Sequence, residues 1–172
     1  SLVQSKLLGN LVFLMMAPLS PLEWFGAYVL AAVLRAALVA LAMTAVTLFF
    51  VHLPVHEPLV LLAMFVLSAG TLAVLGIIAG IVSSKFDHIA AFTNFLITPM
   101  SFLSGVFYSV HALPPFWYKA SHFNPFFYMI DGFRYGFFGV ADMPVGQSLL
   151  ATAVFFVVLS AICLWMLMTG YK

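Results

Sequence analysis

Few residues in this chain could take part in chemistry, and their spacing does not match a catalytic or metal site. His52 and His56 are four positions apart, but Pro54 lies between them and would disrupt a helix that presents both rings on one face. Glu57 follows His56 directly, so the H-E-x-x-H order of zinc peptidases is absent. No arrangement of Ser, His and Asp stands out either. We therefore expect neither a catalytic residue nor a metal site in this chain.

The composition places the chain in a membrane. Apolar residues make up 65% of the sequence and charged residues only 6%, whereas a soluble domain averages about 25% charged residues. The net charge is +1, without a cluster of Lys and Arg, which argues against nucleic acid as a partner. The single cysteine, Cys163, cannot form an internal disulfide. The surroundings of this chain are therefore expected to be membrane lipid.

Four apolar stretches have the length of roughly 20 residues that a helix needs to cross a bilayer. They cover residues 27–51, 59–82, 89–108 and 148–167. We therefore predict an all-α integral membrane protein with four transmembrane helices.

Local signals sharpen this prediction at two places. Ser20-Pro21-Leu22-Glu23 combines an N-cap, a first-turn proline and a capping box, which predicts a helix start at Pro21. In the third stretch, Pro99 and Gly105 predict a kink.

The distribution of Lys and Arg gives the orientation of the spans. If residue 1 is cytoplasmic, the inside segments carry three basic residues and the outside segments two; these are Lys6, Lys85 and Lys172 against Lys119 and Arg134. The first loop contains neither Lys nor Arg. By the positive-inside rule, the N-terminal side of this chain is expected to be cytoplasmic.

The connection 109–147 is not an ordinary loop. Half of the aromatic residues of the chain lie between Phe102 and Phe138. An aromatic belt at the membrane surface is the simplest alternative, and it accounts for Trp117 and Tyr118. It does not account for the proline-marked helix starts within the same region.

Those helix starts predict two short helices before the last span. Asn124-Pro125 is an N-cap followed by a first-turn proline, and Gly139 can end that helix. We expect helices at about 114–122 and 125–138 that dip into the outer leaflet or pack on the spans. Irregular backbone at that depth needs cover from protein or a water-lined cavity.

Five residues in or near the membrane are candidates for function. Arg35 lies inside the first span, where a charge near the bilayer centre costs about 2.5–3.5 kcal/mol. It either faces a translocation path or extends to the cytoplasmic surface by snorkelling. Asp131 and Arg134 share one helix face at i and i+3, so we predict a structural ion pair, with substrate contact as the alternative. Tyr128 and Tyr135 of the same helix are candidates for the lining of an outer exit.

A series of motifs, in order along almost the whole chain, closely resembles the ABC-2 family of transport permeases. These motifs are FLSGVFY at 102–108, LPP at 113–115, NP at 124–125 and GFRYG at 132–136. The segment APLSPLE at 17–23 is similar to the cytoplasmic segment before the third span of that family. Family members are membrane subunits of bacterial ABC exporters. The small inner-membrane branch, which this chain resembles most, handles drugs, lipo-oligosaccharides and polysaccharides.

The resemblance implies a fold and a set of partners. The family has six spans per subunit, with a re-entrant helical hairpin before the last, which falls on 113–138 here. This chain would hold spans three to six, lack the first two and form the later part of a longer protein. It would sit in the bacterial inner membrane as a homodimer that pairs with two ATP-binding subunits.

The resemblance also places a coupling segment in residues 1–20, which would rest on the ATPase; an amphipathic helix lying on lipid is the alternative. Its expected contact residues are Leu11, Phe13, Met15, Met16 and Pro18. The chain has no G-x-x-x-x-G-K-[ST] loop, so ATP and Mg²⁺ are expected at the partner, and no cofactor on this chain.

The function expected on these grounds is that of a permease subunit of an ATP-driven exporter with an amphiphilic cargo: a drug, a lipid or a lipid-linked glycan. A secondary transporter would need several carboxylates within its spans. An intramembrane transferase would need a clustered acid/base set, for which only His111, His122 and Asp131 are available. A structural membrane subunit is the remaining alternative.

Overall fold

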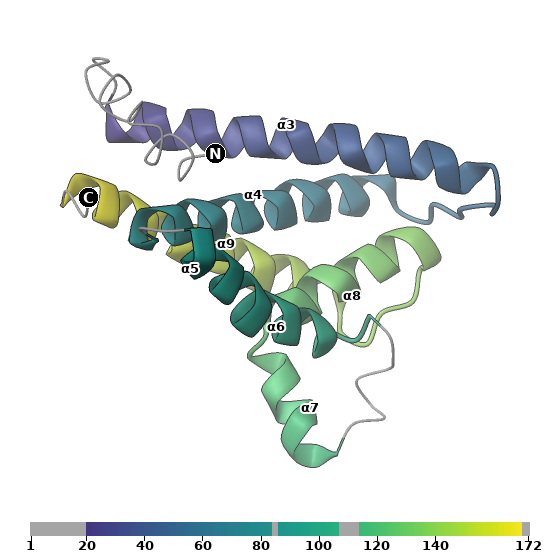
Figure 1. Ribbon diagram of the computed structural model, residues 1–172. Helices are drawn as coiled ribbons and strands as arrows, with labels where there is room; N and C mark the ends of the chain where they lie inside the picture. The colour runs from purple at the N-terminus through teal and green to yellow at the C-terminus, as the bar shows by residue number, and fades with distance from the viewer. Residues whose placement is uncertain (1–19, 84–85, 107–113, 170–172) are drawn as a thin grey trace.

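The computed structural model describes residues 20–83, 86–106 and 114–169, and this part of the chain contains helices and no strand. In chain order they are α3 (Pro21–Leu48), α4 (Pro58–Val82), α5 (Phe86–Phe92), the π-helix η1 (Thr93–Ile97), α6 (Thr98–Phe102), α7 (Pro115–His122), α8 (Pro125–Phe138) and α9 (Val145–Met168) (Figure 1). The predicted all-α class is therefore confirmed.

Three helices of the described ranges are long and apolar enough to cross a membrane, namely α3, α4 and α9. They overlap the stretches predicted as spans at 27–51, 59–82 and 148–167. Many of their large apolar side chains are exposed, and α3 buries none of its residues within this chain. Such helices need lipid or another protein surface around them, which makes the protein an all-α membrane protein.

The start of α3 has the predicted capping box. The Glu23 backbone N–H donates to Ser20 Oγ at 3.3 Å, and the Ser20 backbone N–H donates to Glu23 Oε2 at 2.8 Å. Pro21 occupies the first turn, where its missing N–H leaves no bond unmade. The helix therefore begins at the residue that these local signals indicated.

The stretch 89–108, predicted as a span, is built differently from the other three. Its described part consists of the short helices α5 and α6 with the π turn Thr93–Ile97 between them. Thr98 donates both its backbone N–H and its hydroxyl to the Thr93 carbonyl oxygen. Pro99 comes next, and because a proline lacks an N–H and crowds the carbonyl four residues earlier, a wider turn relieves the contact. A fourth membrane crossing here stays a prediction.

Helix α4 lies at the centre of the bundle and contacts α3, α8 and α9 (Figure 1). Its C-terminal half packs against α9 in a core cluster that partly buried side chains of α3 cover. The cluster consists of Val74, Ile77, Ile81, Cys163 and Met166. Near the N-terminus of α4, the glycines of α8 allow close helix contact, Gly132 against Met64 and Gly136 against Leu61. Small residues at helix contacts are typical of membrane proteins, where close packing stabilises the association.

The two ends of this bundle carry different segments. The start of α3, the end of α9 and the start of α5 lie at one end, while α8 and the 49–57 connection lie toward the other (Figure 1). The backbone N–H groups of His56 and Glu57 both donate to the Gly136 carbonyl oxygen at 3.0 Å. The connection between α3 and α4 is thereby fixed to the C-terminal turn of α8.

We expect that Gly136→Leu separates α8 from α4. A Cβ at this position would lie 2.7 Å from Leu61 Cγ and 3.3 Å from the Leu61 backbone nitrogen, and the backbone cannot move aside as a side chain can. Overpacking of this kind costs about 1–3 kcal/mol. The measurement is thermal unfolding of the purified protein in detergent. Gly146→Leu is the matched control, because a Cβ at Gly146 of α9 meets nothing within 4 Å. Equal melting temperatures for the two variants would contradict the expected contact.

Candidate functional site

Helix α8 has clear boundaries that hold the candidate residues in place. The Asn124 side chain caps its start by accepting from the Phe126 backbone N–H at 3.0 Å, and Pro125 follows. Gly139 ends the helix in the left-handed region, at φ +69°, which a residue without a Cβ adopts freely. The Asn124 Nδ2 group also donates to the Met100 carbonyl oxygen at 2.6 Å, so the cap connects α8 with α6.

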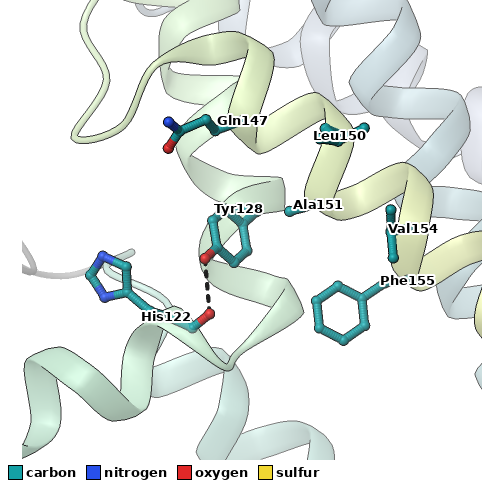
Figure 2. Close-up of a pocket in the computed structure, with 7 residues that line it drawn as sticks. All are labelled: His122, Tyr128, Gln147, Leu150, Ala151, Val154 and Phe155. Carbon is teal, nitrogen blue, oxygen red and sulfur yellow. Dashed lines mark hydrogen bonds between the residues drawn. The ribbon is translucent and has the colours of Figure 1, made fainter.

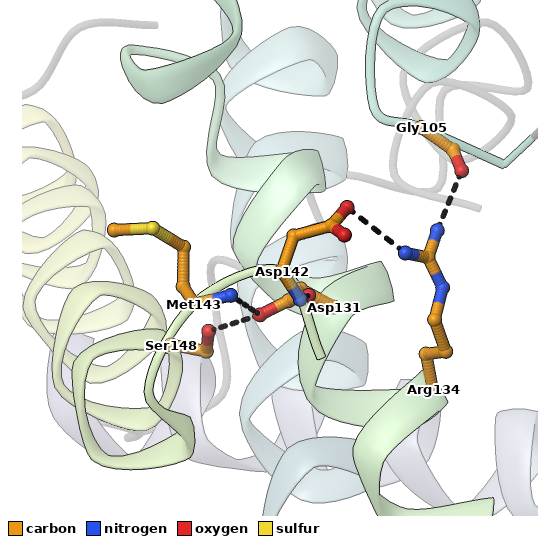
Figure 3. A network of polar contacts seen from close by, with 6 residues as sticks. All are labelled: Gly105, Asp131, Arg134, Asp142, Met143 and Ser148. Atoms are coloured by element: carbon orange, nitrogen blue, oxygen red, sulfur yellow. Dashed lines mark hydrogen bonds and ion pairs between the residues drawn. The ribbon is translucent and has the colours of Figure 1, made fainter. Parts of the chain in front are cut away.

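Asp131 is the buried anchor of this helix. Its exposed fraction is 1%. Its carboxylate accepts from the backbone N–H of Asp142 at 2.6 Å, from that of Met143 at 3.3 Å and from Ser148 Oγ at 2.9 Å (Figure 3). A buried carboxylate is tolerated only where donors replace its water shell. Asp131 therefore fixes the loop after α8 and the first turn of α9 to the middle of α8.

Arg134 pairs with Asp142 and not with Asp131, so the predicted i,i+3 pair is wrong. Its Nη1 lies 3.0 Å from Asp142 Oδ2, and its Nη2 donates to the Gly105 carbonyl oxygen at 2.8 Å (Figure 3). The Asp131 carboxylate instead accepts from three donors of the following loop and α9. The guanidinium is thus left to the loop, where the carboxylate of Asp142 is within reach.

Asp142 and Ser148 are the members of this network that sequence reasoning missed as partners. Asp142 lies in the loop between α8 and α9. A usable signal was its position three residues after Gly139, because a helix that ends at a left-handed glycine turns the following residues back along its side. Ser148 lies on α9, and no local rule relates it to Asp131.

A pocket of about 350 Å³ opens where the start of α8 faces α9. Its polar groups lie at one side and come from His122, Tyr128 and Gln147. The rest of its lining is apolar. The apolar lining comes from Leu150, Ala151, Val154 and Phe155 of α9 (Figure 2). The Tyr128 hydroxyl donates to the His122 carbonyl oxygen at 2.9 Å, and burial raises the pKa of Tyr128, so the phenol stays neutral.

Tyr135 lies apart from this pocket. Its ring meets the His56 ring edge-on, with centroids 5.7 Å apart. This contact adds to the hydrogen bonds between the 49–57 connection and α8. Of the two tyrosines proposed to line an exit, only Tyr128 lines the pocket, and contact of either with cargo stays a prediction.

The remaining candidate residues take no part in the α8 network or lie outside the described ranges. Arg35 lies on α3 in a groove that α3 and α4 share. The residues predicted to contact an ATPase lie outside the described part of the chain; these are Leu11, Phe13, Met15, Met16 and Pro18.

The α8 network positions segments and offers no free reactive group. Both oxygens of Asp131 accept hydrogen bonds, and Arg134 is held by two acceptors. Neither side chain is available as a general acid or base without losing these bonds. The arrangement ties α8 to α6, to the start of α9 and to the 49–57 connection. These hydrogen-bonded segments form one unit, which we call the braced unit. It lies beside a pocket that is apolar on one side and polar on the other.

Comparison with known proteins gives consistent matches. The family model for the ABC-2 type transporter matches residues 1–138. The "Inner membrane transport permease YadH" of Escherichia coli K12 is 37% identical over 166 residues, which cover 96% of this chain and 65% of that protein. Proteins of the same name from Escherichia coli O157:H7 and Shigella flexneri give the same values. No solved structure matches significantly.

The chain thus spans 65% of the length of the curated relatives that it matches. The family match covers most of this chain. This chain belongs to the ABC-2 type transporter family.

Proposed function

We propose that this chain is part of the membrane-spanning permease subunit of an ATP-binding cassette exporter. The exporter would move an amphiphilic substrate, such as a drug, a lipid or a lipid-linked glycan, across the bacterial inner membrane. The observation that carries this proposal is the family match over residues 1–138. The relatives' name, an inner membrane transport permease, supports the same location and the same class of function.

The geometry of the α8 region supports an amphiphilic cargo. The pocket between α8 and α9 offers hydrogen-bonding groups at His122, Tyr128 and Gln147 and an apolar surface beside them. A molecule with a polar head and a hydrocarbon part satisfies both surfaces, whereas a strongly hydrophilic solute would leave the apolar surface in contact with polar groups.

The energy would come from a separate ATP-binding subunit. Residues of the segment 1–20 would transmit its movement, in a dimer of two permease copies with the N-terminal side of this chain in the cytoplasm. Binding of ATP at the partner would shift the dimer between two arrangements. The braced unit around α8 would move as one body, because its hydrogen bonds connect α8 to three other segments.

Co-purification tests this proposal. The full-length protein is tagged and isolated from native membranes, and the eluate is assayed for ATP hydrolysis. We expect an ATP-binding subunit to be recovered with it. Replacing Leu11, Phe13, Met15 and Met16 with serine should abolish this recovery, because these side chains would form the contact.

The matched control changes exposed apolar residues elsewhere. Phe49 and Phe50 follow the C-terminal end of α3 and are 88% and 83% exposed. Their replacement with serine should leave the ATPase attached. A folded, tagged protein that comes out without any ATP-binding subunit would contradict the proposed function. Recovery that is insensitive to the N-terminal replacements would contradict the coupling role alone.

A further inference from the structure

Arg35 lies near the midpoint of α3, an apolar helix that is long enough to cross a membrane. The helix Pro21–Leu48 has 28 residues, which gives a length of about 42 Å at about 1.5 Å per residue. The hydrocarbon core of a bilayer is about 30 Å thick. If the helix is upright and fills the core, its midpoint lies roughly 9 Å or more from either edge of the core. The guanidinium therefore starts from a depth at which a charge needs a partner.

Within the described ranges, no carboxylate pairs with Arg35. The recorded ion pair belongs to Arg134 and Asp142. The Arg35 side chain is exposed on the isolated chain, and a guanidinium offers only hydrogen-bond donors. A buried or lipid-facing charge without a counter-ion is costly, so this position calls for an anionic group supplied from elsewhere.

The space beside Arg35 is an open groove of about 410 Å³ between α3 and α4. Small side chains leave it open, and a Cβ at Gly76 would meet nothing within 4 Å. Apart from Arg35 and the Tyr28 hydroxyl, its lining is apolar. The apolar residues are Ala31, Ala32, Ala73 and Ile77.

We infer that this groove is a binding subsite for the anionic group of an amphiphilic cargo, with Arg35 as its counter-ion. The apolar walls would take the hydrocarbon part, and the guanidinium would pair with a phosphate or carboxylate oxygen. The depth of Arg35 favours a cargo in transit over a resident phospholipid, whose head group stays at the membrane surface. This inference rests on the proposed transport function and adds that the cargo carries negative charge.

Photolabelling of the full-length permease tests the subsite without the ATPase. The protein is placed in phosphatidylcholine vesicles, and the probe is dodecyl phosphate with a diazirine on its chain. Dodecanol with the same diazirine is the uncharged probe. We expect the phosphate probe to label peptides of the groove, and we expect Arg35→Gln to weaken its labelling about tenfold, as loss of one charge-assisted hydrogen bond implies.

Variants separate loss of charge from misfolding. Arg35→Lys keeps a positive charge and should retain most of the labelling. Gly76→Leu fills the groove and should remove labelling by both probes. Leu34→Gln changes an exposed neighbour on α3 that does not line the groove, and it should behave as the wild type.

Several results would overturn the inference. Equal labelling by the two probes, or labelling that Arg35→Gln leaves unchanged, would show that charge plays no part. Loss of labelling in vesicles of equal parts phosphatidylcholine and phosphatidylglycerol would assign the groove to a resident lipid. Loss of cross-linking between two copies in Arg35→Gln would assign Arg35 to a carboxylate of the second copy. Recovery of the ATPase is measured separately, so failure of the transport proposal is distinguishable from failure of this subsite.

Discussion

Replacement of Asp131 with alanine is expected to remove most of the folded protein from the membrane. The carboxylate is buried and accepts three hydrogen bonds, from the backbone of Asp142 and Met143 and from the Ser148 hydroxyl. Alanine would leave these donors without an acceptor where water has little access. An unsatisfied buried group costs about 1–3 kcal/mol, so the summed loss is about 3–5 kcal/mol after allowance for relaxation. Folded yield and thermal unfolding in detergent measure it.

Two further variants should lose less stability than Asp131→Ala, in an order that follows from the hydrogen bonds each one keeps. Asp131→Asn keeps one acceptor oxygen but turns an NH₂ group toward a donor, so its loss of stability should be intermediate. Ser148→Ala removes one donor and leaves the two backbone bonds to Asp131, so it should cost about 1 kcal/mol. A stable Asp131→Ala protein that fails only in transport would show that Asp131 acts on the cargo and does not anchor α8.

The helix boundaries around α8 could be predicted from sequence because their signals are local. Asn124 and Pro125 mark the start, and Gly139 marks the end, within one turn of the residues that they control. The capping box at Ser20 and Glu23 is local in the same way. Such signals depend on neighbouring residues along the chain, which the sequence displays directly.

The contacts of the network could not be predicted, because they join segments far apart in the chain. Arg134 reaches a backbone carbonyl at Gly105, 29 positions earlier. Backbone carbonyls are present at every residue, so no residue type marks this one. The i,i+3 rule described the helix face correctly, but it could not show that backbone donors from the next loop already occupy Asp131. The π turn before Pro99 is a similar case, since a proline marks a distortion without fixing its form.

The pocket at Tyr128 could not be predicted from sequence either, because it forms where two helices pack together. Tyr128 was selected as an aromatic residue of a re-entrant helix, and the structure places it against α9. The apolar wall comes from α9, which begins 17 residues later, and the bond from Ser148 to Asp131 helps to hold the start of α9 against α8. The pocket therefore depends on the packing of two helices that no local sequence signal relates.

Replacement of Arg134 is expected to loosen two separate segments, because its guanidinium bridges them. Nη1 pairs with Asp142, and Nη2 donates to the Gly105 carbonyl oxygen. Arg134→Gln should lose both bonds, at a cost of about 1–3 kcal/mol that is reduced by the partial exposure of the pair. Hydrogen exchange measures this by segment. The amides of Asp142 and Met143 report on the loop, and the amides of Leu103 and Ser104 report on the end of α6.

Single-arm variants distinguish a bridge from a general loss of stability. Asp142→Asn removes the charge pair and keeps the bond to Gly105, so exchange should quicken in the loop while the end of α6 stays protected. Arg134→Lys keeps one charged group but cannot fork to two acceptors in different directions, so the end of α6 should exchange faster while the loop retains most of its protection. If the three variants raise exchange equally in both segments, the guanidinium does not hold them independently. Faster exchange in the loop alone for Asp142→Asn, and at the end of α6 alone for Arg134→Lys, would mean that this side chain joins α6 to the start of α9. Helix α8 would then carry movement from one to the other.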